Sequence, residues 1–296
     1  MKVRFFPLCF TALVGFFPLV HATDLEAIKM QAGQGNAEAE FELGRAYQRG
    51  EGVSLDYTRA AELYRKSAAL GNAKAMNNLG FLYGEGKGVK PDPAESLKWY
   101  RLGAEHGANL SQLKLGYMYL HGQGVPKDAK EAAQWFQKAA EQGLGDAALQ
   151  LGQIYYFGDE GVKKDYIEAA KWLMQAADQG NPFAQNMLGE MNEDGLGMPQ
   201  NGKQAADWYT KAAEQGNAKA QSNLGRVFLE GNIVKRDRLQ AYKWLKLGAD
   251  QKEITAQRLF SDLLKEGALT PAQIEEGDRQ VNQYQSQKQQ AKSPSE

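Results

Sequence analysis

The residues that could do chemistry are spread singly along this chain. Its three histidines are His21, His106 and His121, and its one cysteine is Cys9. A zinc site needs several closely spaced ligands, and two separate internal histidines without a cysteine do not provide them. The sequence patterns of a zinc protease, a serine hydrolase and a nucleotide-binding P-loop do not occur. We therefore expect no catalytic residue, no metal site and no cofactor, although the 36 acidic residues leave an acid–base carboxylate pair open.

Two recurrent features imitate functional motifs. The run Gly84–Gly88 looks like a phosphate-binding loop, but it lacks a preceding strand and the Lys-Ser/Thr ending, and similar glycine turns recur along the chain. Aspartates also recur at one spacing, at Asp56, Asp92, Asp128, Asp165 and Asp237. Aspartate suits the N-cap of a helix, because its carboxylate accepts hydrogen bonds from free backbone N–H groups. We interpret these residues as helix caps rather than as a carboxylate active site.

The sequence repeats itself six times with a period of 36 residues. Each copy predicts a helix, a glycine turn and a second helix, because apolar residues recur every three or four positions on both sides of the turn. The copies are 36–71, 72–107, 108–143, 144–180, 181–216 and 217–252. Asparagines near their starts are expected to cap the first helix: Asn36, Asn72, Asn109, Asn181 and Asn217. The fold class is therefore all-α, a solenoid of helix-turn-helix repeats.

Two positions are the same in nearly every copy. A Leu-Gly pair stands in the first helix, beginning at Leu43, Leu79, Leu115, Leu151, Leu188 and Leu224. Glycine inside a helix costs about 1 kcal/mol relative to alanine, so its recurrence predicts a close approach between helices. All five tryptophans share one position of the second helix: Trp99, Trp135, Trp172, Trp208 and Trp244. We interpret them as core wedges between neighbouring repeats, with a ligand-stacking platform as the alternative.

This pattern resembles the Sel-1-like repeat family, which is related to tetratricopeptide repeats. The resemblance covers residues 36–252, and its fifth copy departs from the pattern at Asn192, Met198 and Asn201. It implies a right-handed α-solenoid that serves as an adaptor or scaffold, often in bacteria. It carries over no catalytic residue.

The first 22 residues predict a signal peptide. Basic Lys2 and Arg4 precede an apolar run, and Val20-His21-Ala22 forms a small-residue cleavage site. A signal anchor is the alternative, but the apolar run is shorter than the roughly 20 residues that span a bilayer. Cleavage before Thr23 leaves a mature chain without cysteine, which is compatible with an oxidising compartment. We expect an exported bacterial protein, either periplasmic or secreted.

The remaining segments flank the repeats. Residues 23–35 are expected to form an N-terminal capping helix and residues 253–284 C-terminal capping helices, because solenoids need polar ends. Residues 285–296 are rich in Gln, Lys and Ser, and we expect a disordered tail. Signal removal changes the formal net charge from −1 to about −3, which gives no basic footprint for nucleic acid. We expect a monomer with no membrane span after signal removal.

The variable positions of the first helix suggest a binding surface. At about 100° per residue, the third, sixth, tenth and thirteenth positions point away from the core, towards the expected concave groove. Phe183 is one of several apolar residues at the third and sixth positions. Apolar groups rimmed by polar ones mark interaction sites. We therefore predict that a protein or peptide binds Phe81, Leu110, Leu113, Tyr117, Leu120, Leu149 and Tyr156. The alternative is that some of these side chains pack beneath the neighbouring copy.

The favoured function is a secreted or periplasmic scaffold that mediates protein–protein interaction. One alternative is a cell-envelope enzyme or binder for peptidoglycan or β-lactam-type ligands. It rests on cysteine-rich relatives of the repeat family, whose cysteine pairs the mature chain lacks. The other alternative is a host-directed, virulence-associated binding factor, which differs from the scaffold only in location and partner.

Overall fold

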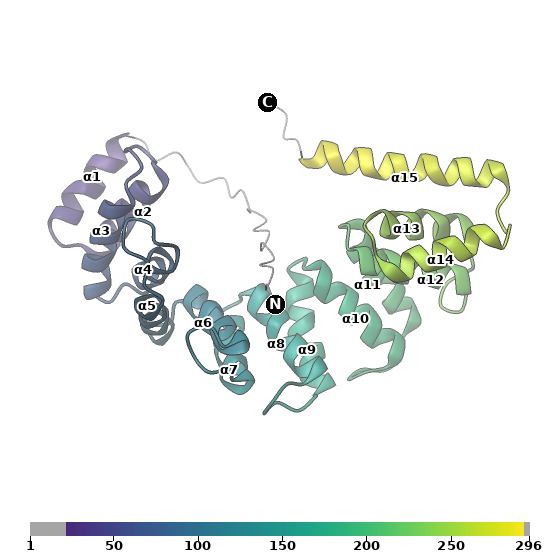
Figure 1. The fold of residues 1–296 in the computed structure, drawn as a ribbon, viewed down its shortest axis with the longest axis horizontal. Helices are drawn as coiled ribbons and strands as arrows, with labels where there is room; N and C mark the ends of the chain where they lie inside the picture. Colours follow the sequence, from purple (N-terminus) through teal and green to yellow (C-terminus); the bar gives the residue numbers. More distant parts are fainter. Residues whose placement is uncertain (1–21, 293–296) are drawn as a thin grey trace. The chain divides into compact units, whose positions relative to one another are not determined.

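The computed structural model describes residues 22–292, which are mostly helical (Figure 1). The helices in this range are α1 (Ala22–Gly33), α2 (Ala37–Arg49), α3 (Tyr57–Ala69), α4 (Ala73–Glu85), α5 (Pro93–Glu105), α6 (Asn109–His121), α7 (Ala129–Glu141), α8 (Gly145–Phe157), α9 (Tyr166–Asp178), α10 (Pro182–Asp194), α11 (Gly202–Glu214), α12 (Ala218–Glu230), α13 (Arg238–Asp250), α14 (Ile254–Lys265) and α15 (Pro271–Lys292). The predicted signal peptide lies outside the described residues, apart from Ala22.

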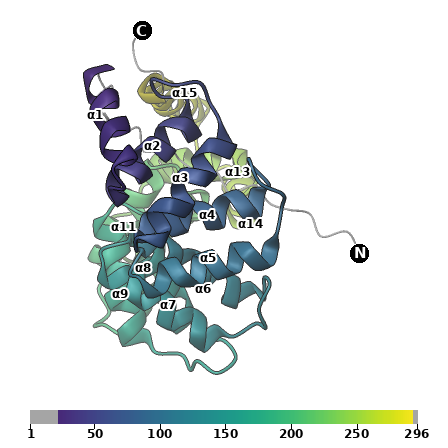
Figure 2. The same ribbon diagram turned by 90° about the vertical axis from the view of Figure 1, so that its left-hand side faces the viewer.

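The chain folds as two compact units, Met1–Trp99 and Tyr100–Glu296. In the second unit the hairpins α6–α7, α8–α9, α10–α11 and α12–α13 follow one another in chain order (Figure 1). In the first unit, the helices α1 to α4 also follow one another in chain order, and each packs on the next (Figure 2). The predicted all-α solenoid of helical hairpins is confirmed. Positions within a repeat are counted below from Asn36, Asn72, Ala108, Leu144, Asn181 and Asn217, each of which is position one.

The first helices begin at asparagine caps in four repeats. The side chains of Asn36, Asn72, Asn181 and Asn217 each accept a hydrogen bond from a backbone N–H of the helix that follows. The prediction for Asn109 is wrong. That residue is the first of α6, and its N-cap is Ala108, which has no side chain able to accept the bond. The first helix of the next repeat, α8, also lacks a side-chain cap, because Leu144 occupies the position.

The recurrent aspartates are helix caps, as predicted. Asp128 accepts hydrogen bonds from the backbone N–H groups of Lys130 and Glu131, both at 3.0 Å. Asp56, Asp92, Asp165 and Asp237 accept equivalent bonds at the starts of α3, α5, α9 and α13. Asn201, which replaces aspartate in the fifth repeat, caps α11 in the same way. These side chains are therefore used by the fold.

The glycine of the Leu-Gly pair lies where two helices of a hairpin approach closely. A Cβ atom on Gly116 would lie 2.6 Å from Cε1 of Phe136, and one on Gly189 would lie 2.5 Å from Cε1 of Tyr209. The same holds for Gly44, whose added Cβ would meet the ring of Tyr64. No real Cβ fits at such distances, so the second helix presses its large side chain directly onto the backbone of the first. The predicted close approach is confirmed at these positions.

The tryptophans contribute to the core to different extents. Trp172, Trp208 and Trp244 are buried, whereas Trp99 and Trp135 are half-buried. A lysine ammonium lies over each of the five indoles, as close as 3.9 Å from the ring centroid for Lys138 and Trp135. Each lysine makes a cation–π contact with its indole, which fits the interpretation of the tryptophans as structural wedges.

The C-terminal helix is longer than predicted. α15 runs to Lys292, so the expectation of disorder is wrong for residues 285–292, and residues 293–296 lie outside the described range. α15 packs on α13, where Tyr242 donates a hydrogen bond of 2.8 Å to Asp278 of α15. Tyr284 of α15 also donates a hydrogen bond of 3.0 Å to the carbonyl of Ala213 in α11. Among residues 22–292, no helix combines the length and apolarity of a membrane span.

Candidate partner-binding surface

The outward face of the first helices comprises positions 3, 7, 10 and 14 of each repeat, rather than the predicted positions 3, 6, 10 and 13. Side chains at the third and fourteenth positions are exposed in all six repeats, and those at the tenth are half-buried. The sixth position is buried in four repeats, at Phe41, Leu149, Asn186 and Ser222. Positions 3, 7, 10 and 14 follow the spacing of one helix face, whereas position 6 turns towards the neighbouring repeat. We call the side chains at positions 3, 7, 10 and 14 the outer stripe.

The seven predicted binding residues differ in the exposure of their side chains and lie in both units of the chain. Leu110 is 53% exposed, and Phe81, Leu113, Tyr117, Leu120 and Tyr156 are half-buried. Leu149 is only 8% exposed and belongs to the core, so the prediction that its side chain faces outward is wrong. The cause is its sixth position, which the adjacent repeat covers. Phe81 lies in the first unit, and the other six residues lie in the second.

Tyr117 is the central aromatic residue of α6. Its ring packs edge-on against Phe136 with centroids 5.3 Å apart, and it stacks on His121 at 6.2 Å. Burial, together with the nearby carboxylate of Asp146, raises the pKa of Tyr117 to about 12. Tyr117 therefore stays neutral at physiological pH and presents a half-buried ring beside a negative charge.

Tyr156 on α8 has a similar setting. It packs edge-on against Phe157 at 4.9 Å and against Tyr166 at 5.5 Å. Burial raises its pKa, and the carboxylates of Glu190 and Asp194 add to the increase. An aromatic cluster with acidic neighbours thus lies at the C-terminal end of α8.

Two strongly exposed aromatic residues were missing from the predicted set. Phe157 at position 14 is 62% exposed, and Phe183 at position 3 of α10 is 60% exposed. In the other repeats, position 14 is always polar, with Arg49, Glu85, His121, Asp194 and Glu230. This contrast between copies was the sequence signal for Phe157, and it was missed because position 14 was not assigned to the outward face.

The equivalent face of α10 and α12 is filled by a polar network. Arg226 donates to both carboxylate oxygens of Glu193, at 2.8 and 2.7 Å, and Tyr209 donates to Glu193 at 2.7 Å. Burial opposes the charge on Glu193, but these hydrogen bonds hold its pKa below the usual value. Lys219 lies 2.7 Å from Glu190. The chain itself therefore satisfies the charged groups of this network.

Positions 13 and 29 form a side-chain pair in two repeats. In the fifth, Tyr209 donates its hydroxyl to Glu193, and in the first, Tyr64 donates to Gln48 at 2.5 Å, whereas the second repeat places Gly84 opposite Tyr100. In the third repeat, both members are apolar, with Leu120 and Phe136. In the fourth repeat, which is one residue longer, position 13 is Tyr156 and the equivalent of position 29 is Leu173. The sixth repeat also places two apolar residues, Leu229 and Leu245, at these positions.

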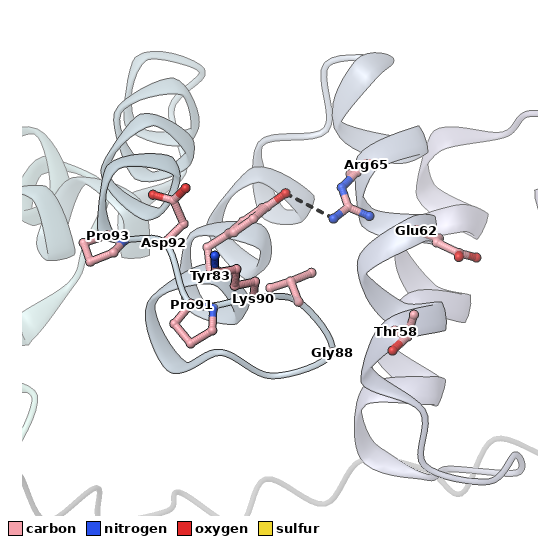
Figure 3. Close-up of a pocket in the computed structure, with 10 residues that line it drawn as sticks. Thr58, Glu62, Arg65, Tyr83, Gly88, Lys90, Pro91, Asp92 and Pro93 are labelled. Carbon is pink, nitrogen blue, oxygen red and sulfur yellow. Dashed lines mark hydrogen bonds between the residues drawn. The ribbon is translucent and has the colours of Figure 1, made fainter.

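A separate hollow of about 550 Å³ lies in the first unit (Figure 3). Arg65 of α3 points across it to Tyr83 of α4 and donates a hydrogen bond of 3.1 Å to the tyrosine hydroxyl. The same pair recurs at the equivalent positions of the second unit, where Arg101 donates to Tyr119 at 3.3 Å. Because the pair repeats, we assign it to repeat packing rather than to a ligand site. Among residues 22–292, no group of three His, Cys, Asp or Glu side chains is placed to hold a metal ion.

Comparison with known proteins identifies the family. The model of the Sel1 repeat matches residues 37–72, 73–107, 109–144, 145–181, 182–217 and 218–253. These matches cover most of the chain, and the protein belongs to the Sel1 repeat family. None of the curated proteins compared with the chain matches it.

Two crystal structures are similar over most of the chain. One is a protective antigen present in uropathogenic Escherichia coli strains, with 34% identity, a TM-score of 0.79, and coverage of 88% of this chain and 57% of that one. This chain therefore spans little more than half of that protein. The other is a Sel1 repeat protein from Oxalobacter formigenes, with 32% identity, a TM-score of 0.64, and coverage of 77% of this chain and 90% of that one.

Proposed function

We propose that this protein is an exported scaffold that binds a protein or peptide segment through the outer stripe of α6 and α8 and the start of α10. We use the name apolar patch for Leu110, Tyr117, Phe157 and Phe183 of the outer stripe, together with Tyr156 at the adjoining position 13. Sel1 repeats are a protein-interaction fold, and repeat solenoids offer extended surfaces for binding.

One observation carries the proposal. Leu110 and Phe183 stand at position 3, Tyr117 at position 10 and Phe157 at position 14, where α12 places Lys219, Arg226 and Glu230. Exposed aromatic groups are costly to leave in water and are enriched at interaction sites. The fold does not require apolar groups at positions 3, 10 and 14, since these positions are polar in the sixth repeat.

Export is proposed mainly from the N-terminal sequence. The signal pattern of residues 1–22 ends before Thr23, and the description of the Escherichia coli relative as an antigen fits a protein that leaves the cytoplasm. Mass spectrometry of protein from fractionated cells tests this step. We expect a chain that begins at Thr23 in the periplasm, on the surface or in the medium, and an uncleaved cytoplasmic chain would contradict export.

The binding function is tested with matched variants. Leu110→Ser/Phe183→Ser removes exposed apolar groups from the patch, and Leu70→Ser/Ile254→Ser removes exposed apolar groups elsewhere. Affinity capture from an envelope fraction, read by mass spectrometry, should retain a protein on the wild type and on the control but not on the patch variant. Equal retention by all three folded proteins would contradict the proposed surface.

A further inference from the structure

Lysines of the chain contact aromatic and acidic side chains of the first helices in the first unit. Lys74, at position 3 of the second repeat, reaches back to the first repeat. Its ammonium lies 3.2 Å from Oε1 of Glu38 and 5.6 Å from the ring centroid of Phe41. Lys87 lies 5.0 Å from the ring centroid of Phe81. In the first unit, lysines of the chain therefore cover the aromatic rings of the first helices.

The same rule holds at the other end of the solenoid. Lys219, at position 3 of the sixth repeat, reaches back to Glu190 of the fifth. Arg226 reaches back to Glu193 in the same direction. A cation on one repeat thus satisfies a carboxylate on the preceding one, twice.

The third, fourth and fifth repeats have no cation at position 3, although α6 carries the exposed Lys114 at position 7. Position 3 holds Leu110, Asp146 and Phe183 in the third, fourth and fifth repeats. α8 and α10 together carry four acidic residues and no basic one: Asp146, Glu190, Glu193 and Asp194. Within residues 100–292, Asp146 and Asp194 have no ion-pair partner, and no lysine or arginine lies over the ring of Tyr117 or Tyr156. The start of α8 explains an acid at Asp146, but not the missing cation.

We propose that the partner supplies the cation. The bound segment carries Lys or Arg beside aromatic or aliphatic side chains, so that its basic groups meet Asp146 and Asp194 while its apolar groups cover Tyr117, Phe157 and Phe183. This inference rests on the proposed function, and it adds the chemistry of the partner. It assigns to the partner the role that Lys74 and Lys219 have within the chain.

Two physical terms favour such a segment. A cation over an aromatic ring is attracted by the negative face of the ring, and complementary charge at the rim of an interface speeds association and selects the partner. Because the carboxylates are exposed, salt screens the attraction over about 10 Å at 0.1 M ionic strength. Binding should therefore weaken several-fold when the NaCl concentration is raised from about 0.05 to 0.5 M.

The test uses a displayed library of random 12-residue peptides, selected on the purified protein. The tightest peptide is synthesised with a fluorescent label, together with a version in which every Lys and Arg is replaced by Gln. Anisotropy titrations compare the wild type with Asp146→Lys, which supplies the cation from within the chain, and with Asp178→Lys on the exposed end of α9. A Leu110→Ser/Phe183→Ser protein reports whether the apolar patch is used at all.

The expected result is a basic, apolar peptide that binds about tenfold more weakly after Gln replacement and about tenfold more weakly to Asp146→Lys. The Asp178→Lys control should bind like the wild type. Peptides that need Leu110 and Phe183 but are neutral or acidic would overturn this inference and leave the proposed function standing. Peptides that bind the Leu110→Ser/Phe183→Ser protein unchanged, or the absence of any selected peptide, would contradict both.

Discussion

The outer stripe of α6 and α8 and that of α12 occupy the same repeat positions but are completed in different ways. Around α12, Arg226, Lys219 and Asn223 bond to carboxylates and amides of the preceding repeat. Around α6 and α8, Tyr117 and Tyr156 are half-buried and Phe157 is exposed, and Asp146 and Asp194 have no ion-pair partner within the described residues. The hairpin scaffold therefore tolerates both the polar surface around α12 and the more apolar surface around α6 and α8. The apolar one is therefore better explained by binding than by folding.

The largest expected effects test whether the scaffold is the same in both regions. Gly116→Val in the apolar region and Gly189→Val in the polar region each force a side chain into a ring of the second helix. Each should lower the free energy of unfolding by about 3 kcal/mol, since overpacking costs 1–3 kcal/mol and a branched residue adds helix strain. Urea unfolding measures both. Gly33→Ala, where nothing lies within 4 Å, is the control and should be neutral or slightly stabilising. A large difference between the two valine variants would show that the hairpins are not equivalent.

The next effect concerns the polar region alone. Glu193→Gln should cost about 1–3 kcal/mol at pH 7, because Arg226 and Tyr209 lose a charged acceptor. The pKa of Glu193 is lowered by folding, so its stabilisation is complete above the ordinary value of 4.5 and is lost as the pH falls through the folded value. The difference between the two proteins in thermal unfolding should therefore shrink below about pH 4. A difference that stays constant down to pH 3 would contradict the role of the ionised carboxylate.

The coupling energy between positions 13 and 29 is expected to be smaller than the cost of Glu193→Gln, and it tests whether these two positions act as a pair. Phe136→Tyr alone buries a hydroxyl without an acceptor and should cost about 1–3 kcal/mol. Combined with Leu120→Glu, it recreates the Tyr209–Glu193 pair of the fifth repeat. A double-mutant cycle should give a favourable coupling of about 1 kcal/mol or more. Additive losses would show that the two repeats differ in more than these two residues.

The smallest effect on stability belongs to the apolar patch. Leu110→Ser/Phe183→Ser changes side chains that are 53% and 60% exposed, so unfolding should shift by no more than about 0.5 kcal/mol. Differential scanning calorimetry on this variant and on Leu70→Ser/Ile254→Ser gives the comparison. A marked loss of stability in the patch variant alone would mean that these residues serve the fold.

The sequence predicted most of the fold because each hairpin is specified locally. The caps at Asp128 and Asn181 and the glycine at Gly189 report helix ends and close approaches within one repeat. The tail was less predictable. Residues 285–292 contain few apolar groups and so suggested disorder, although Gln, Lys and Ala are good helix formers and extend α15 from its packed start.

The candidate site was harder to predict, because it depends on contacts between repeats. Leu149 is buried by the packing of neighbouring repeats, which helical periodicity within one repeat does not contain. The network of Glu193, Arg226 and Tyr209 joins three helices and is visible in the sequence only as a difference between copies. Comparing positions across the six repeats, rather than within one helix, also exposes Phe157 as an exception.

The central claim is that α6 and α8 bind a partner while the network around α12 holds the fold. Hydrogen–deuterium exchange, with and without the tightest selected peptide, tests it most directly, because bound segments slow the exchange of the backbone beneath them. We predict protection in α6, α8 and the start of α10, with no change in α12. Protection centred on α12, or spread over the second helices α7, α9 and α11, would contradict the account.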